Sequence, residues 1–220
     1  MSNIYQVNCI SKKISVLSDS SLLIEFYSEK DISDFSFKLG KKLKEKFSFI
    51  IDIVPTFSSV AVYFSHDANI LHYKKLIEDF FNNQSNLIFK KDSDDIGVLH
   101  TIHVNYNGKD LQRVAEEKKL NNKELIDIHT NKIYIVQFLG FVPGFAYLGS
   151  LDKRISLPRK INPDKNVPKG SVAIAENYTA IYPVTSPGGW NIIGHTNYEM
   201  INEKFSIKLK PGDKVKFVSI

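Results

Sequence analysis

The chain has 220 residues, of which 43% are hydrophobic and 24% are charged, a composition typical of soluble globular proteins. Its 29 basic and 24 acidic residues give a net charge of +5, but the lysines are scattered along the chain, which argues against nucleic-acid binding. A single cysteine, Cys9, excludes an intrachain disulfide and a cysteine zinc site. We find neither a signal-peptide pattern nor a long apolar run, so we expect a cytoplasmic protein without membrane contact.

The first part of the chain alternates the patterns of strands and helices. Runs of β-branched and aromatic residues predict strands, and apolar residues at helical spacing predict two helices. The predicted strands cover Ile14–Leu17, Ser21–Tyr27, Phe49–Val54, Val60–Phe64 and Leu87–Phe89, and the helices cover Asp31–Phe47, with Asp31 as N-cap, and Ala68–Phe81. This order contains a split βαβ pattern, so we expect a ferredoxin-like α+β domain over residues 1–92.

Residues 90–95 are polar and charged, and we interpret them as a linker. The chain beyond them combines short strands with Gly/Pro turns, which predicts a β-barrel or sandwich over residues 97–220 and an α+β fold overall. The predicted strands are Gly97–Val104, Ile133–Leu139, Gly170–Ala175, Thr179–Tyr182, Asn191–Ile193, Phe205–Leu209 and Lys214–Val218, and the helices are Asp110–Leu120 and Asn121 or Asn122 to His129. The turn Lys210–Asp213 predicts that the last two strands form a hairpin.

Two segments, Phe138–Gly149 and Ser186–Gly194, concentrate glycine, proline and aromatic residues. Glycine lets a ligand approach the backbone, proline stiffens a loop, and aromatic rings supply broad apolar walls. The combination predicts a concave surface whose aromatic candidates are Phe141, Phe145, Tyr147, Tyr182 and Trp190. The same rings are equally compatible with a hydrophobic core, and for Trp190 the two interpretations have equal weight.

Few other residues suggest chemistry. His100 and His103 are three apart in a predicted strand and point to opposite faces, so we expect no metal site. Ser186 and His195 lie near each other but outside any nucleophile-elbow motif, so a turn-shaping role is favoured for the serine. His129, at a predicted helix end, is a candidate general base, although a histidine there more often complements the helix dipole.

The turn Pro168–Ser171 offers a lysine and backbone N–H groups, which suit an anion. Turns of this composition are common, so this pattern alone is a weak signal. No Walker A or Gly-x-Gly-x-x-Gly motif is found, and any nucleotide site would therefore use other residues.

Several motifs in one order resemble the first-subunit half of the carboxyltransferase-like family. They are Leu139–Gly149, Leu157–Arg159, Val167–Val172, Ile181–Pro183 and Ser186–Trp190. This family includes the B subunit of 5-oxoprolinase, the subunit-1 region of allophanate hydrolase/urea amidolyase proteins, and the sporulation kinase A inhibitor. The resemblance covers residues 98–220 most strongly. It implies a cyclophilin-like β-barrel behind an α+β N-terminal domain.

The resemblance also implies a function: a subunit of an ATP-dependent 5-oxoprolinase that converts 5-oxo-L-proline to L-glutamate, inactive alone. The implied partners are a larger homologous subunit and a lactamase-like subunit, with ATP and Mg²⁺ shared among them. Under this reading the candidate catalytic residues are His129 and Arg159. The candidate substrate- or nucleotide-binding residues are Phe141, Pro143, Gly144, Phe145, Tyr147, Lys169, Gly170, Ser171, Tyr182, Ser186, Gly188, Gly189, Trp190 and His195.

Several positions depart from the family pattern, and the arginine usual before the Val-Pro turn is missing from Pro163–Asn166. Tyr178 stands where a polar amide is usual, Ala180 replaces a glycine, and His195 replaces an arginine. These changes leave two alternatives open, a binding protein that inhibits a sensor histidine kinase and a carboxyltransferase half of a urea-carboxylase-like system. The second alternative needs a separate biotinylated carrier, because the chain has no Met-Lys biotin-attachment pair.

Overall fold

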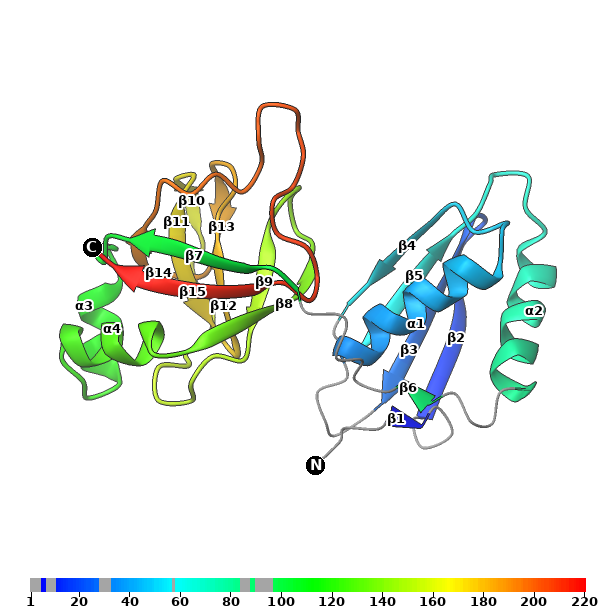
Figure 1. The fold of residues 1–220 in the computed structure, drawn as a ribbon, viewed down its shortest axis with the longest axis horizontal. Helices are drawn as coiled ribbons and strands as arrows, with labels where there is room; N and C mark the ends of the chain where they lie inside the picture. The colour runs from blue at the N-terminus through cyan, green and yellow to red at the C-terminus, as the bar shows by residue number, and fades with distance from the viewer. Residues whose placement is uncertain (1–4, 7–10, 28–32, 57, 84–87, 90–96) are drawn as a thin grey trace. The chain divides into compact units, whose positions relative to one another are not determined.

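The computed structural model describes residues 5–6, 11–27, 33–56, 58–83, 88–89 and 97–220 (Figure 1). The chain divides into two compact units, residues 1–95 and 96–220, and each is described by itself. The predicted N-cap Asp31 and the predicted linker 90–95 lie outside the described residues. In the described ranges, none of the helices combines the length and the apolar character needed to span a bilayer.

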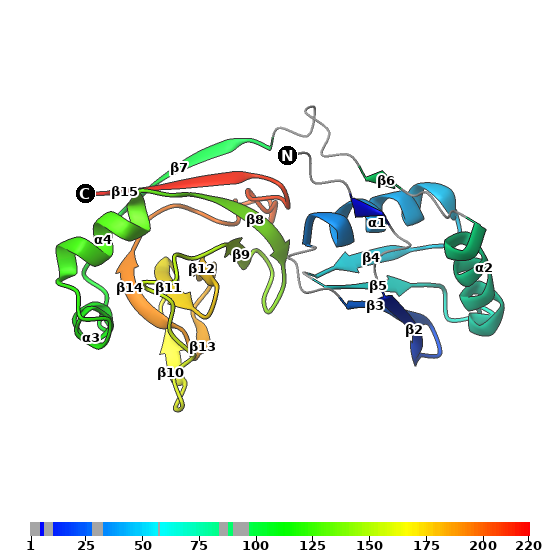
Figure 2. The same cartoon turned by 90° about the horizontal axis from the view of Figure 1, so that it is seen from below.

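The N-terminal unit is built on a four-stranded antiparallel sheet in the order β2-β3-β5-β4. Its elements are β1 (Tyr5–Gln6), β2 (Ser11–Ser18), β3 (Ser21–Tyr27), α1 (Ser33–Lys46), β4 (Asp52–Pro55), β5 (Ser59–Tyr63), α2 (Ile70–Asn83) and β6 (Ile88–Phe89). Helix α1 packs on β4 and β5, and α2 packs on β2 and β3 (Figure 2). Phe35, Leu39 and Leu43 lie at helical spacing on α1 and are fully buried, as their pattern predicts.

The topology of this unit differs from the ferredoxin-like expectation at one edge. Strands β3 and β4 flank β5 and are both antiparallel to it, so the split βαβ arrangement is present. The position beside β3 is occupied by β2, which precedes β3 in a hairpin. The strand that follows α2, β6, pairs with β1 instead. A ferredoxin-like domain would place the strand after its second helix beside β3, so that topology is not confirmed.

The C-terminal unit is a nearly closed barrel of seven strands in the order β14-β11-β12-β9-β8-β15-β7. Its elements are β7 (Leu99–Val104), α3 (Leu111–Glu117), α4 (Asn122–Thr130), β8 (Ile133–Leu139), β9 (Ala146–Gly149), β10 (Asp164–Val167), β11 (Ser171–Ala175), β12 (Tyr178–Ile181), β13 (Ser186–Gly188), β14 (Asn191–His195) and β15 (Lys214–Ser219). A bridge between Asn105 and His195 joins its two ends, and β10 pairs with β13 in a small separate sheet.

Alternation along the strands fills the barrel. Ile102 and Val104 of β7 and Val215 and Phe217 of β15 point inward and are fully buried. Helix α3 packs on β14 and α4 packs on β15, close to the two ends of the sheet (Figure 2). The start of α4 is fixed by a capping box, which the sequence encodes locally. The two helices therefore cover the region where the barrel closes.

The predicted final hairpin is wrong. Strand β15 pairs in parallel with β7 and antiparallel with β8, and residues 205–209 form no strand. The parallel partner of β15 is far away in sequence, with Lys214 opposite Leu99, which no local turn signal can indicate. The sequence interpretation also missed β9, β10 and β13. Strands β9 and β13 lie within the Gly/Pro segments, where a strand pattern is interrupted, and β10 is a short, mostly polar strand.

Candidate functional site

The two Gly/Pro/aromatic segments meet in one aromatic cluster with edge-to-face and stacked contacts. Its members are Phe138, Phe141, Phe145, Tyr147, Tyr178, Tyr182 and Trp190. Phe145, Tyr182 and Trp190 are exposed by 1%, 1% and 5%, so these three rings form a small core. The sequence was compatible with these rings lining a cleft or filling a core. The structure shows that they form a core, because the rings pack on one another.

The accessible part of the aromatic cluster is smaller than the sequence suggested. Phe141 is 60% exposed, Pro143 is exposed, and Tyr147 is half-buried. Gly144 and Gly188 are packing glycines: a Cβ at Gly188 would lie 2.2 Å from the Tyr182 hydroxyl. The aromatic cluster therefore offers an exposed rim around Phe141 and Tyr147 rather than a deep aromatic cleft.

Arg159 lies on this rim. Its Nε is 3.3 Å from Glu176 Oε1, and both side chains are more than half exposed. A Cβ on Gly189 would lie 3.8 Å from Arg159 Cβ, which places Arg159 against the Gly188-Gly189 loop. Burial raises the pKa of Tyr147, and the positive charge of Arg159 partly opposes this increase. Arg159 can thus present a cation beside an aromatic wall.

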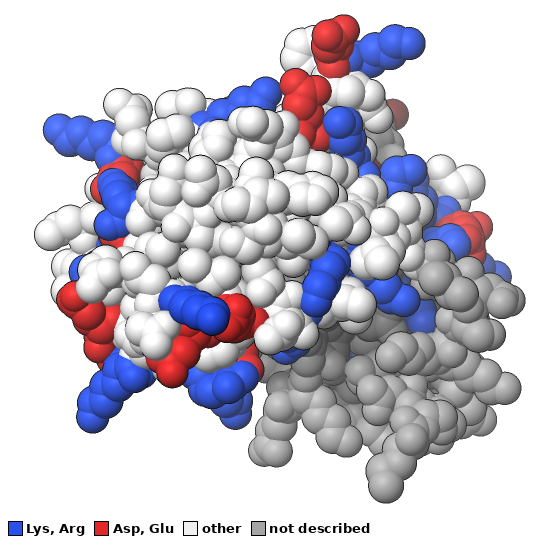
Figure 3. All heavy atoms as spheres, turned by 60° about the vertical axis from the view of Figure 1, so that its left-hand side comes forward, with Lys and Arg blue, Asp and Glu red and all other residues white. Residues whose placement is uncertain are grey.

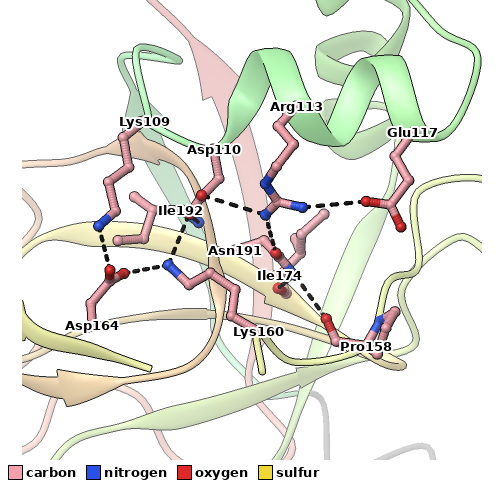
Figure 4. A network of polar contacts seen from close by, with 10 residues as sticks. All are labelled: Lys109, Asp110, Arg113, Glu117, Pro158, Lys160, Asp164, Ile174, Asn191 and Ile192. Carbon is pink, nitrogen blue, oxygen red and sulfur yellow. Dashed lines mark hydrogen bonds and ion pairs between the residues drawn. The ribbon is translucent and has the colours of Figure 1, made fainter. Parts of the chain in front are cut away.

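A network of polar contacts fixes the loops behind this rim (Figure 4). The Asp110 carboxylate accepts from the Ile192 N–H at 2.8 Å and from Lys160 Nζ at 3.1 Å. Lys160 also pairs with Asp164, whose second ion pair is with Lys109 at 2.7 Å. Burial acts to raise the pKa of Asp164, but hydrogen bonds from Lys109 and Lys160 outweigh it, and the pKa is lowered.

The amide of Asn191 extends the network to neighbouring segments. Its Oδ1 accepts from Arg113 at 2.6 Å, and its Nδ2 donates to the carbonyls of Pro158 and Ile174. The Lys160 N–H donates to the Gly189 carbonyl at 2.7 Å. The network therefore holds the loop that carries Arg159 and the Gly-Gly-Trp loop in one fixed arrangement. Sequence reasoning missed it, because Asp110, Lys160 and Asn191 are far apart in the sequence and only the fold brings them together.

A second candidate site lies where the barrel closes. Beyond the Asn105–His195 bridge, β7 and the segment after β14 enclose an open groove of about 440 Å³. We call it the seam groove; Thr101, His103, Asn105, Asn107, the segment His195–Tyr198 and Ile220 line it. Among these described lining residues there is no Lys, Arg, Asp or Glu. Of the predicted site residues only His195 lines this groove.

The turn Pro168–Ser171 lies beside the seam groove. His195 Nε2 is 3.1 Å from the Lys169 carbonyl, and because a carbonyl only accepts, Nε2 carries the hydrogen. Gly170 has φ +83°, and a Cβ there would lie 2.3 Å from the Thr196 carbonyl oxygen. The turn and His195, separated in sequence, are therefore brought into direct contact.

The backbone of this turn does not fit the predicted role of a phosphate cradle. The Gly170 N–H donates to the Tyr182 carbonyl at 2.8 Å, and the Ser171 N–H donates to the Pro168 carbonyl at 3.2 Å. The Lys169 N–H donates to Thr185 Oγ1. These three donors already have partners within the chain, and the exposed Lys169 side chain is the cation that the turn presents.

His129 and Ser186 do not form a reactive site. His129 is fully buried, and desolvation lowers its pKa to about 3, so it stays neutral in the core and is no accessible general base. Ser186 is 8% exposed, and its Oγ has no hydrogen-bond partner among the described residues, His195 included. In the same ranges, no three His, Cys, Asp or Glu side chains gather as a metal site.

The sequence matches the family model described as carboxyltransferase domain, subdomain C and D, over residues 12–207. The chain belongs to this family. A relative from Bacillus subtilis, named as the B subunit of 5-oxoprolinase, is 35% identical over 94% of this chain and 92% of its own length. A relative of the same name from Escherichia coli O157:H7 is 44% identical, over 50% of this chain and 52% of its own length.

Several solved structures share the fold of this chain. TTHA0988 is 26% identical with a TM-score of 0.72, covering 91% of this chain and 40% of its own. The conserved uncharacterized protein PH0987 from Pyrococcus horikoshii is 36% identical with a TM-score of 0.54, covering 94% and 97%. The urea amidolyase of K. lactis is 13% identical with a TM-score of 0.69, covering 97% of this chain and 15% of its own, a likeness of fold alone.

Proposed function

We propose that the protein is the B subunit of an ATP-dependent 5-oxoprolinase that converts 5-oxo-L-proline to L-glutamate in the cytoplasm. The observation that carries this proposal is the Bacillus subtilis relative of that name, because the alignment spans nearly the whole length of both chains. The proposed partners are a larger subunit with a related barrel and a lactamase-like subunit. The cyclophilin-like character of the barrel belongs to the same proposal.

The proposed reaction requires activation of a lactam carbonyl before hydrolysis. A five-membered lactam is a stable amide, and transfer of a phosphoryl group to its carbonyl oxygen creates a good leaving group before water opens the ring. Developing negative charge on the transferred group requires positioned cations or N–H donors. In this chain the exposed cations near the candidate sites are Arg159 and Lys169. We assign ATP and Mg²⁺ to a site completed by the partner subunits, because the backbone donors of the 168–171 turn are used internally.

The role of Arg159 in this proposal is electrostatic. Its guanidinium is 56% exposed, and its only ion-pair partner among the described residues is the equally exposed Glu176. Such a pair costs little to open, so the guanidinium can turn towards a phosphoryl or carboxylate group of the assembled complex. The polar network around Asp110 holds the backbone of the Arg159 loop still while the side chain moves.

The test is reconstitution. The chain is mixed with its genomic neighbours of the larger and lactamase-like types, ATP, Mg²⁺ and 5-oxo-L-proline, and glutamate is measured. We expect glutamate only from the complete mixture, and less of it with Arg159→Met than with wild type. Arg154→Met is the matched control, because Arg154 is an exposed arginine of the same unit that pairs with Asp152 away from the rim. A complete mixture without glutamate, together with suppression of histidine-kinase autophosphorylation by this chain, would contradict the proposal.

A further inference from the structure

The outward side of β8, β15 and β7 carries lysine among aliphatic side chains. Side chains alternate along β15, so Val215 is buried in the barrel while Lys214 and Lys216 point outward. The strand register places an aliphatic residue of β8 and an uncharged residue of β7 beside each lysine. We call this surface the lysine face, and its members are Leu99, Thr101, Ile133, Ile135, Lys214 and Lys216.

The aliphatic members of the lysine face are open to solvent. Leu99, Ile133 and Ile135 are exposed by 53%, 50% and 46%. A strand with one side in the core usually carries polar residues on its other side. The methylene stems of the two partly buried lysines join the aliphatic side chains of β8 to Leu99 of β7. Aliphatic groups gathered in this way, unlike single exposed ones, indicate a contact surface for another molecule.

Lys214 and Lys216 give the lysine face a positive charge. Neither of them forms an ion pair within the described ranges of the chain. The neighbouring acid, Asp213, is buried and points away from this face. Its carboxylate accepts from the Val98 and Lys210 N–H groups and lies 3.1 Å from Nε2 of His100. The lysine face therefore presents cations that no described carboxylate neutralises, and a complementary surface is acidic.

The lysine face continues into the aromatic cluster. Ile135 is paired with Gly149 of β9, and Gly149 is paired with Tyr178 of β12. The Tyr178 ring contacts the rings of Phe138 and Tyr147. The lysine face and the rim that carries Arg159 are therefore neighbouring parts of one side of the barrel.

Strand β7 adds an unprotected edge. It ends the sheet order, and no described strand pairs with the edge of β7 that faces away from β15. Proteins usually cover such an edge or place charged side chains on it, but β7 contains no charged residue. The Ile220 N–H donates to the Val104 carbonyl, so Ile220 lies beside β7. Figure 3 views the unit from that side and shows a broad area without Lys, Arg, Asp or Glu, as in the core of a protein interface.

We propose that the lysine face is the docking surface for the larger subunit, which presents Asp or Glu among apolar side chains there. The choice of this partner rests on the proposed function. A carboxylate opposite Lys214 or Lys216 forms an ion pair, and the aliphatic neighbours on both sides keep water from it. Such a pair orients the partner and opposes wrong partners, while the aliphatic contacts supply affinity.

A second copy of this chain fits the lysine face poorly. A two-fold contact buries the same surface on both copies, so the lysines of one copy would face those of the other. Like charges brought together in this way disfavour the contact. Docking of the larger subunit also places it next to the rim with Arg159, where the proposed function requires completion by a partner.

The first test measures binding of the full chain to the larger protein encoded beside it, by titration calorimetry. We expect binding at least about tenfold weaker for the double variant Lys214→Glu/Lys216→Glu, and about fivefold weaker for Ile135→Thr, which keeps a β-branched side chain. Lys214→Arg/Lys216→Arg should bind nearly as wild type. Lys123→Glu on α4 is the control, because this exposed lysine has no ion pair among the described residues and lies outside the lysine face. Thermal unfolding of each variant alone confirms that it is folded.

The second test maps the contact by maleimide labelling. Leu99→Cys in a Cys9→Ser background introduces one thiol on the lysine face. We expect it to react in the chain alone and at least about tenfold more slowly with saturating larger subunit. Leu17→Cys in the same background is the matched control, because Leu17 is a strand leucine exposed by 55% in the N-terminal unit. Its labelling rate should not change.

The outcomes separate this inference from the proposed function. Lack of binding, variants that bind as wild type, a thiol at position 99 that is not protected, or self-association that the double variant abolishes would each overturn the docking surface. If the reconstituted mixture then still makes glutamate, the proposed function stands without it. If the double variant loses binding while the complete wild-type mixture makes no glutamate, the docking surface stands and the proposed function fails.

Discussion

The hydroxyl of Tyr106 and Nδ1 of His129 lie 2.7 Å apart in the core of the C-terminal unit. Thr179 Oγ1 donates to the Ala173 carbonyl, so it can only accept from His129 Nε2, which lies at 2.9 Å. His129 is therefore the neutral Nε2–H form, and its Nδ1 accepts from Tyr106. Burial raises the pKa of Tyr106, which keeps the donor protonated. The chain Tyr106–His129–Thr179 ties α4 to β12 and to the loop after β7.

This arrangement predicts an acid-sensitive fold. The His129 pKa falls to about 3 in the folded state, against about 6.5 when unfolded. Protons bind the unfolded chain first, so this contribution is fully present above pH 6.5 and is lost as the pH falls towards 3. The expected slope is about 1.4 kcal/mol per pH unit in this window. Urea unfolding at several pH values measures it, and His129→Leu should lack this part of the slope.

Trp190→Ala should destabilise the protein by roughly 3–5 kcal/mol, because the ring is buried and packs on Phe145 and Tyr147. Phe141→Ala is the matched aromatic control. Its ring is 60% exposed, so we expect a change of less than about 1 kcal/mol. Thermal or urea unfolding of both variants measures their stability. A similar loss of stability in the two variants would show that Trp190 is not a core residue.

Gly170→Ala should be much more harmful than Gly212→Ala. Both glycines have positive φ, +83° and +91°, so each substitution incurs backbone strain of roughly 1–2 kcal/mol. At Gly212 nothing lies within 4 Å of a new Cβ, whereas at Gly170 the Cβ would meet the Thr196 carbonyl and His195. We expect a total loss of at least about 3 kcal/mol for Gly170→Ala, with overpacking added to strain. Equal unfolding midpoints for the two variants would contradict the contact at Gly170.

Lys160→Met should destabilise the C-terminal unit, because it leaves the Asp110 and Asp164 carboxylates without their shared cation. The Lys160 and Asp110 side chains are only 15% and 11% exposed, and breaking such a buried pair costs roughly 3–5 kcal/mol. Arg154→Met removes the exposed partner of Asp152 and should cost at most about 1 kcal/mol. Chemical denaturation of both variants measures the difference in the free energy of unfolding. A small loss of stability for Lys160→Met would show that Lys109 and Arg113 are enough to compensate the Asp164 and Asp110 carboxylates.

Local patterns predicted much of the secondary structure. The apolar spacing of α1 lies within a few turns of one helix, so it can be recognised without knowledge of the fold. The same local motifs, from Leu139 to Trp190, predicted the carboxyltransferase family, which the family comparison confirms. Strands β10 and β13 escaped prediction because β10 is short and mostly polar and β13 contains proline and glycine, so only their pairing with each other marks them as strands.

The sequence by itself thus determined the family, most helices and strands, and the presence of an aromatic cluster. Only the tertiary structure decided which candidate residues are buried and which are exposed. Trp190 and His129 became core residues because neighbours distant in sequence enclose them. The N–H groups of the 168–171 turn were used because Tyr182 and Thr185 lie opposite. The seam groove lies beside the bridge from Asn105 to His195, and such long-range pairing depends on closure of the whole barrel.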